Sequence, residues 1–189
     1  HILESDTHAN LGVVLSACRG VTDALLNLVI AAERQEDTLT QRLDELRARH
    51  RTIADALLKD SARDEFLTRF EEDCNDILRI LQTVQLIRAA SQALRDLVAG
   101  YGEIWSTRLF AEYLRSRGRR PGTVLWVDAR EIVCVEWGPL GPAVQWDVSS
   151  ANAARLIPRE PATLIITGFI ARDRKGLQTT LGRNGSDFS

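Results

Sequence analysis

The chain has 189 residues, of which 44% are hydrophobic and 26% charged, and its formal net charge is −2. This length and composition suffice for one well-buried core, or for most of a larger domain. The small net charge gives no electrostatic drive toward nucleic acid or a membrane surface. No apolar run reaches the roughly 18 residues that a membrane-spanning helix needs. We therefore expect neither a nucleic-acid nor a membrane partner.

The cysteines and histidines show no spacing typical of a metal site. Cys18, Cys74 and Cys134 are far apart, and no pair forms Cys-x-x-Cys. This pattern argues against a disulfide framework or a zinc site and favours a reducing compartment. We therefore expect no metal bound by these side chains, and a cytoplasmic location. The three histidines, which we expect at the surface, are His1, His8 and His50.

The first predicted unit is a strand, a turn and a helix. Residues 11–17 form an apolar run with β-branched residues, which indicates a buried strand. The chain passes through residues 16–20 into a helical pattern that begins at Val21, with Thr22 or Asp23 placed to cap it. Such a unit presents backbone N–H groups and the positive end of a helix dipole to an anion.

The next segment is predicted to be helical. Residues 21–99 contain neither glycine nor proline, and charged breaks at 34–37 and 59–63 divide them into several helices. We expect residues 100–102 to end a short helix, and Glu103 to open another that stops at Gly118. A long apolar stripe, expected to pack against a sheet, consists of Phe66, Phe70, Ile77, Leu81, Val84 and Ile87. A shorter stripe consists of Leu43, Leu46, Ile53 and Leu57.

The pattern of apolar residues changes after Pro121. Residues 123–127 and 132–135 are predicted strands, and the second is followed by a loop that contains glycine and proline. Residues 148–156 look helical, and 162–170 form the strongest predicted strand. Strands separated by helices favour an α/β sheet with crossover connections rather than a helical bundle.

The last eleven residues form a predicted anion-binding loop. Gly182 and Gly185 flank Arg183 and allow positive φ or a close approach to a ligand. Arg183 supplies a planar fork suited to a carboxylate or phosphate, and Asp187 supplies a fixed negative charge. The loop lies just downstream of the predicted strand at 162–170.

Five segments together resemble the conserved blocks of aspartokinases. Residues 13–23 resemble the second block, and 102–109 resemble the Gly-Glu-x-x-Ser block. Residues 126–130, 167–170 and 180–187 resemble later blocks in the same order, whereas 136–146 match no block. The sequences of these segments are most similar to those of kinase domains fused to homoserine dehydrogenase. The resemblance implies a three-layer α/β/α sandwich with a largely parallel sheet and a helix-rich segment at 21–117.

The resemblance also implies an activity. Aspartokinases phosphorylate the side-chain carboxylate of L-aspartate with ATP and Mg²⁺, the first step toward threonine, methionine and lysine, and we expect a homo-oligomer. The Lys-Phe-Gly-Gly-Thr/Ser phosphate loop of the family does not occur in the chain. The nucleotide half of the family domain would follow Ser189. We therefore expect residues 1–189 to be a partial catalytic domain, the amino-acid-binding half, and to be inactive alone.

The resemblance assigns roles to seven residues. It implies that Glu103 receives the substrate ammonium and that Arg183 receives a carboxylate, while Asp187 orients phosphate-binding lysines. The remaining substrate-binding candidates are Ser16, Thr22, Phe169 and Ser186.

The residue types alone leave ordinary alternatives open for these positions. Glu103 would be a first-turn carboxylate stabilised by the helix dipole. Ser16 and Thr22 would be helix caps, Phe169 a core residue, Arg183 an exposed loop residue and Asp187 a turn residue.

Two other functions stay open. Another carboxylate or carbamate kinase of the same superfamily would share the fold, although the Glu103 block argues against it. A non-enzymatic helical interaction module built on residues 21–117 belongs to a different class and predicts no ligand at the 182–187 loop.

Overall fold

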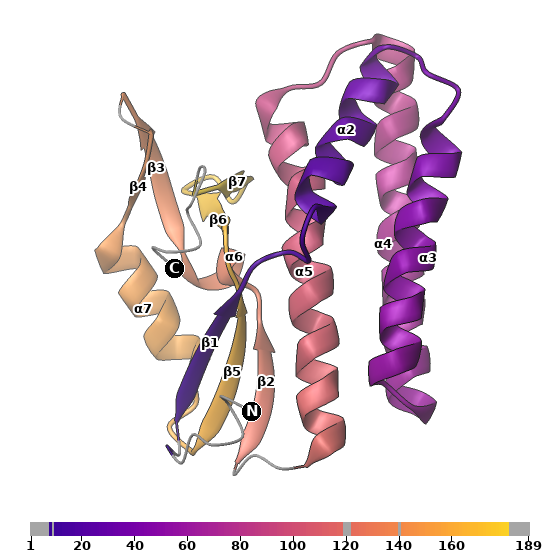
Figure 1. Ribbon diagram of the computed structural model, residues 1–189. Helices are drawn as coiled ribbons and strands as arrows, with labels where there is room; N and C mark the ends of the chain where they lie inside the picture. Colours follow the sequence, from indigo (N-terminus) through magenta and orange to yellow (C-terminus); the bar gives the residue numbers. More distant parts are fainter. Residues whose placement is uncertain (1–7, 9, 119–121, 140, 182–189) are drawn as a thin grey trace.

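The computed structural model describes residue 8 and residues 10–118, 122–139 and 141–181. Long helices stand beside two small sheets, and the helix α7 lies on the other side of the sheets (Figure 1). This helix–sheet–helix order agrees with the predicted α/β class. In chain order the elements are β1 (Leu11–Leu15), α2 (Val21–Glu33), α3 (Leu39–Leu57), α4 (Asp60–Ile87), α5 (Gln92–Arg117), β2 (Thr123–Val127), α6 (Ala129–Ile132), β3 (Cys134–Gly138), β4 (Gly141–Val144), α7 (Trp146–Leu156), β5 (Ala162–Thr167), β6 (Ile170–Asp173) and β7 (Gln178–Thr180).

The first sheet is parallel, in the order β1–β5–β2. Its central strand β5 is buried along nearly its whole length, which explains its continuous apolar sequence. Leu15 at the end of β1 pairs with Thr167 at the end of β5. The carboxyl ends of these two strands therefore lie side by side.

The second sheet is mixed, in the order β4–β3–β6–β7. The predicted loop after residue 135 is wrong, because β3 and β4 pair as an antiparallel hairpin. The strand predicted at 132–135 starts later, at Cys134, because the short helix α6 includes Ile132. The strand predicted at 162–170 is two strands, since β5 ends at Thr167 and β6 begins at Ile170 in the other sheet.

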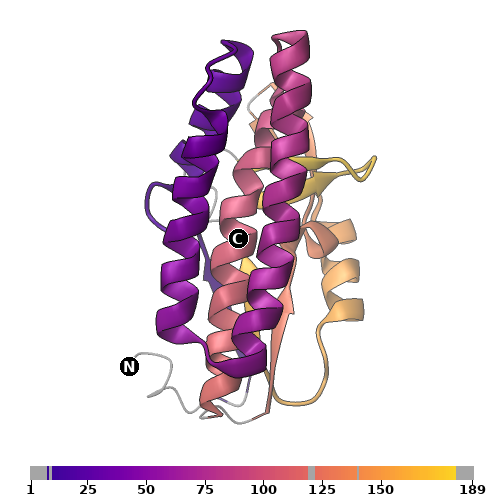
Figure 2. The same ribbon diagram turned by 90° about the vertical axis from the view of Figure 1, so that its right-hand side faces the viewer.

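Helix α5 connects the helical layer to the parallel sheet (Figures 1 and 2). It contacts all three strands of that sheet and also packs against α2 and α4. The long apolar stripe of α4 faces the helices α2, α3 and α5, so the expectation that it packs against the sheet is wrong. The same buried cluster nevertheless includes Ile170 of β6, which makes the helices and sheets parts of one core.

The glycines of residues 100–102 do not end a helix. Gly100 and Gly102 lie inside α5, which runs unbroken through Glu103. A Cβ atom on Gly102 would lie 2.9 Å from the Cβ of Ala17, and one on Gly100 would lie 2.3 Å from Nε2 of Gln178. Close packing, rather than termination, therefore explains both glycines. Glu103 is not in a first turn, so the helix-dipole alternative for this residue is wrong.

His50 is fully buried, so the expectation that it lies at the surface is wrong. Its ring stacks on Phe70 at a centroid distance of 5.2 Å and meets the ring of Trp105 edge-on at 5.0 Å. Nδ1 lies 2.9 Å from the carbonyl oxygen of Leu46. Burial lowers the pKa of His50, so the neutral ring is favoured in this aromatic setting.

Smaller details also differ from expectation. The break between α3 and α4 is only Leu58 and Lys59, because α4 begins at Asp60. Leu57 and Ile87, the last members of the two predicted stripes, are exposed. All three cysteines are free. Within the described ranges, no helix is long and apolar enough to cross a membrane.

Replacing Ile77 by aspartate tests the shared core. Ile77 is fully buried in α4, whereas Leu86 on the same helix is 81% exposed. Ile77→Asp is expected to lower the free energy of unfolding by roughly 3–5 kcal/mol, because it buries an unpaired carboxylate. Leu86→Asp, the matched control, should change it by less than about 0.5 kcal/mol. Thermal unfolding followed by circular dichroism and by tryptophan fluorescence should show one common midpoint; two midpoints would mean that the helices unfold independently.

Candidate functional site

The candidate site lies at the carboxyl edge of the parallel sheet. The amide of Gly168 donates a hydrogen bond to the carbonyl of Leu15 (2.9 Å), which joins the ends of β5 and β1. The amide of Ala129 at the start of α6 donates to Oγ1 of Thr167 (2.8 Å), which brings in the end of β2. In open α/β sheets this edge is where ligands bind.

Glu103 reaches this edge from the middle of α5. Its side chain is only 3% exposed. Oε1 accepts a long hydrogen bond from the amide of Ala17 (3.4 Å), whereas Oε2 is buried with no partner among the described residues. Burial raises the pKa of Glu103 to about 7. A buried carboxylate with an unpaired oxygen is suited to a cationic hydrogen-bond donor.

The loop after β1 is docked onto the same helix. Oγ of Ser106 donates to the carbonyl of Ser16 (2.7 Å). Gly102 leaves the space that the Ala17 side chain needs. Ser16 itself is exposed, and Thr22 is half-buried in the first turn of α2. The structure therefore places Ser16 in the segment that contacts the helix of Glu103.

The predicted capping of α2 by Thr22 or Asp23 is wrong. The N-cap residue is Gly20, with φ of 78° and no side-chain cap hydrogen bond. Glycine adopts this left-handed conformation without steric cost, so the turn itself starts the helix. The role of Thr22 as a substrate-contacting hydroxyl stays a prediction.

Phe169 forms a tight turn between β5 and β6. The amide of Ile170 donates to the carbonyl of Gly168 (2.7 Å), which closes a γ-turn around Phe169. Phe169 has φ of 66°, a rare and strained value for a bulky residue. Its half-buried ring packs against the main core. Strain of this kind costs about 1–3 kcal/mol and tends to cluster at functional sites.

The turn at Phe169 also binds the residue that leads into the glycines of the predicted anion-binding loop. The carbonyl of Phe169 accepts a hydrogen bond from the amide of Leu181 (2.7 Å). The prediction that this loop starts at Thr179 is wrong, because β7 extends to Thr180. Leu181 immediately precedes Gly182, the first glycine of the loop. Arg183, Ser186 and Asp187 lie outside the described residues, so their predicted roles stay predictions.

Sequence reasoning missed the side chains that hold α5 in place. Oγ1 of Thr107 donates to the carbonyl of Glu103 (2.7 Å) and accepts a hydrogen bond from Nε1 of Trp126 (2.8 Å). The guanidinium of Arg108 lies 4.8 Å from the Trp126 ring centroid and also binds Asp73 (2.8 Å). Because Trp126 and Asp73 are distant from α5 in the sequence, no local pattern could have paired them with Thr107 and Arg108.

Within the described part of the chain, no group of three or more His, Cys, Asp or Glu side chains could hold a metal ion. Among the described residues, the edge offers a buried carboxylate, backbone amides, hydroxyls and a strained turn.

Comparison with known sequences relates the chain to amino-acid kinases. The sequence profile of the amino acid kinase family matches residues 2–189. The chain is 35% identical over 182 residues to the chloroplastic bifunctional aspartokinase/homoserine dehydrogenase 1 of Zea mays, covering 94% of this chain and 19% of that protein. It is 34% identical over 191 residues to the lysine-sensitive aspartokinase 3 of Escherichia coli K12, covering 100% of this chain and 40% of that protein.

Solved structures of aspartokinases are also similar to this chain. The crystal structure of E. coli aspartokinase III in complex with aspartate and ADP matches with a TM-score of 0.78 and 32% identity, over 94% of this chain and 38% of that one. The complex of the same enzyme with lysine and aspartate matches with a TM-score of 0.79 and 30% identity, over the same shares. The chain thus spans about one fifth of the bifunctional relative and two fifths of aspartokinase 3. Because the family profile runs along almost all of its length, the chain belongs to the amino acid kinase family.

Proposed function

We propose that this chain supplies the amino-acid-binding half of an aspartokinase catalytic domain, in which ATP phosphorylates the side-chain carboxylate of L-aspartate. The observation that carries the proposal is the buried carboxylate of Glu103, with one oxygen unpaired, at the carboxyl edge of the sheet. The aspartokinase relatives, and the E. coli enzyme bound to aspartate and ADP, support it. Those relatives carry the matching segment within longer chains, so we place the reaction in a full-length enzyme that contains it.

The substrate determines which receptors are needed. Aspartate has one ammonium and two carboxylates, and Glu103 matches the ammonium. Arg183 would bind the carboxylate that does not react, through its bidentate fork. Hydroxyls of Ser16, Thr22 and Ser186, together with the amide-rich start of α2, would orient the reacting carboxylate. Phe169 would line the pocket. Phosphoryl transfer needs little covalent help, so this positioning is the main contribution of these residues.

ATP is the proposed second substrate, accompanied by Mg²⁺. The described residues contain no acidic cluster fit for a metal ion. Asp187 would orient phosphate-binding groups. We also propose a homo-oligomer and a cytoplasmic location, although the maize relative is named as chloroplastic.

The 189-residue chain alone is expected to show no kinase activity. Its sequence lacks a Lys-Phe-Gly-Gly phosphate loop, and it spans two fifths or less of the relatives compared. The measurement is a coupled assay of ADP formation, with a full-length aspartokinase as the positive control. ADP formation that depends on added aspartate would contradict this expectation.

Glu103→Gln in the full-length enzyme tests aspartate recognition. Loss of the charge match to the ammonium should raise the KM for aspartate about 5- to 150-fold, equivalent to roughly 1–3 kcal/mol. The KM for ATP should stay within about twofold. Arg183→Lys should act similarly, because lysine lacks the bidentate fork. Glu112→Gln, the same change elsewhere on α5, is the matched control.

A shift in the KM for ATP instead would contradict the assignment of Glu103. The same kinetics also test the alternative that the enzyme is another kinase of the same superfamily. Preferred phosphorylation of a substrate without an ammonium group would favour another carboxylate kinase or a carbamate kinase.

The raised pKa of Glu103 predicts opposite effects of pH on stability and on binding. The folded protein holds the proton up to a pH of about 7, whereas the ordinary pKa is 4.5. The free energy of unfolding should therefore fall as pH rises from 4.5 to about 7, by on the order of 3 kcal/mol. The kcat/KM for aspartate should rise over the upper part of this range, because the ammonium requires the ionised carboxylate.

Urea unfolding of the chain and steady-state kinetics of the full-length enzyme, both measured as a function of pH, check these two trends. Glu103→Gln should flatten the change in the free energy of unfolding. An unchanged pH dependence in this variant would show that another group titrates.

A further inference from the structure

We propose that Gln178 is a positioning residue: its side-chain amide fixes β7 against the part of α5 that carries Glu103. The proposal rests on the proposed function, because it concerns how the strand that precedes the predicted anion-binding loop is fixed on the helix that carries Glu103. Neither the substrate-binding candidates nor the conserved blocks include Gln178.

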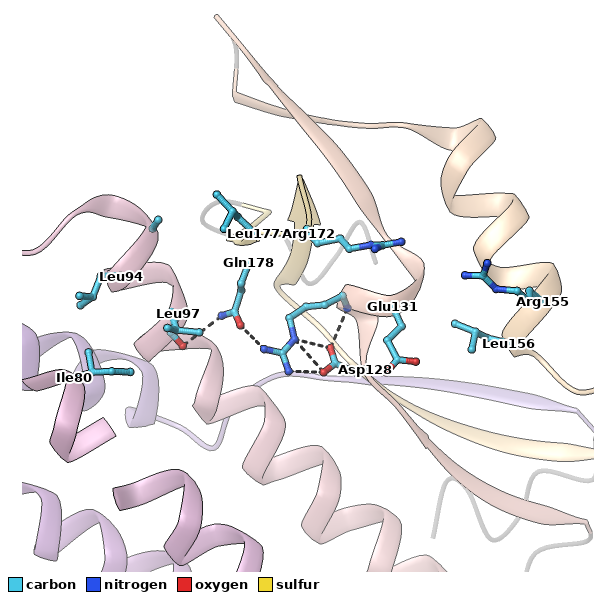
Figure 3. A pocket seen from close by; sticks show the side chains of 13 residues that line it. Ile80, Leu94, Leu97, Asp128, Glu131, Arg155, Leu156, Arg172, Leu177 and Gln178 are labelled. Atoms are coloured by element: carbon cyan, nitrogen blue, oxygen red, sulfur yellow. Dashed lines mark hydrogen bonds and ion pairs between the residues drawn. The ribbon is translucent and has the colours of Figure 1, made fainter. Parts of the chain in front are cut away.

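The amide of Gln178 is held from two sides (Figure 3). Nε2 donates to the carbonyl oxygens of Asp96 (2.8 Å) and Leu97 (3.3 Å) in α5. Oε1 accepts a hydrogen bond from Nη1 of Arg130, whose guanidinium also binds Asp128. Because a guanidinium only donates and a carbonyl only accepts, these partners determine which way the amide faces.

Gly100 makes this contact possible. A Cβ atom at Gly100 would lie 2.3 Å from Nε2 of Gln178, so any other residue displaces the amide. Glu103 follows Gly100 by three positions on the same helix, about 4.5 Å along its axis. Arg183 follows Gln178 by five positions in the sequence. One contact therefore joins the segment that carries the predicted ammonium receptor to the segment that leads into the predicted carboxylate receptor.

Further hydrogen bonds hold β7 and the residue that follows it. Oγ1 of Thr179 donates to Oδ2 of Asp96 at 3.4 Å, and accepts from Nε1 of Trp137 at 2.9 Å. The amide of Leu181 donates to Phe169. The strand is thus tied to α5 at residues 178 and 179, and Leu181, which follows it, is tied to the strained turn at Phe169.

The side chain of Gln178 is not needed to fill a core. It borders a cavity of about 810 Å³ that other residues of α5, α6, β6 and α7 also line (Figure 3). An amide displaced by a new Cβ therefore has space to turn into this cavity. A Cβ atom at Gly100 would also lie 2.9 Å from Cγ2 of the buried Ile170, so Gly100→Ala removes the amide contact and shifts Ile170 slightly as well. Gln178→Leu removes the amide contact and leaves Gly100 and Ile170 unchanged, so it is the cleaner variant.

The experiment compares Gly100→Ala, Gln178→Leu and the double variant in the full-length enzyme. Each single variant should raise the KM for aspartate about tenfold and leave the KM for ATP within about twofold, since slight misplacement of a positioning group is costly. The double variant should be no worse than either single variant, because both changes remove the same contact. Gly12→Ala is the matched control, since a Cβ there would have no atom within 4 Å.

Three results would overturn the proposal. An unchanged KM for aspartate in both single variants would show that the Gln178 amide has no positioning role. Additive losses in the double variant would show that Gly100 and Gln178 act separately. A purely structural role would instead raise the KM for both aspartate and ATP and lower the midpoint of thermal unfolding in parallel.

The proposed function fails on a different result. If Glu103→Gln leaves the use of aspartate unchanged, the assigned substrate receptor is wrong, whatever the Gln178 variants do. Conversely, a large effect of Glu103→Gln with no effect of Gly100→Ala or Gln178→Leu leaves the proposed function standing and removes only the positioning role.

Discussion

The close approach of two side chains, those of Ala17 and Gln178, to helix α5 is the constraint on which the site depends. Gly102 admits the loop after β1, and Gly100 admits the amide of Gln178 on β7. Side chains at these positions would overlap with their neighbours, since the nearest atoms would be 2.9 Å and 2.3 Å away. Because Glu103 follows Gly102 directly, the approach of the loop also buries its carboxylate.

Two energetically unfavourable features meet at this edge of the sheet. The buried carboxylate of Glu103 has an unpaired oxygen and a raised pKa, and Phe169 adopts a strained positive φ. Neither feature stabilises the folded protein, and such features concentrate where a ligand or a reaction uses them. A bound ammonium would supply a hydrogen-bond donor and a positive charge to the unpaired oxygen of Glu103. The hydrogen bond from Leu181 to Phe169 connects the second to the predicted anion-binding loop.

The helical layer supports this edge rather than forming a module of its own. His50 and Phe70 surround Trp105 of α5, which anchors the helix on the side away from the sheet. On the sheet side, Trp126 of β2 donates its hydrogen bond to Thr107, four residues after Glu103. Helix α5 is therefore held from both sides, and this arrangement argues against the rival view of an independent interaction module.

The sequence by itself determined the α/β class, the strands β1, β2 and β5, the helical stretch and the ordered family blocks, because these are local patterns of apolar spacing and motif. It placed Glu103 and Phe169 among the site candidates. Only the tertiary structure decided that Gly100 and Gly102 lie inside a helix, that His50 is buried and that one predicted strand divides at Phe169. Each of these depends on a neighbour distant in the chain, such as Gln178 for Gly100 and Trp105 for His50. A glycine that ends a helix and one that admits a partner look the same until that partner is in place.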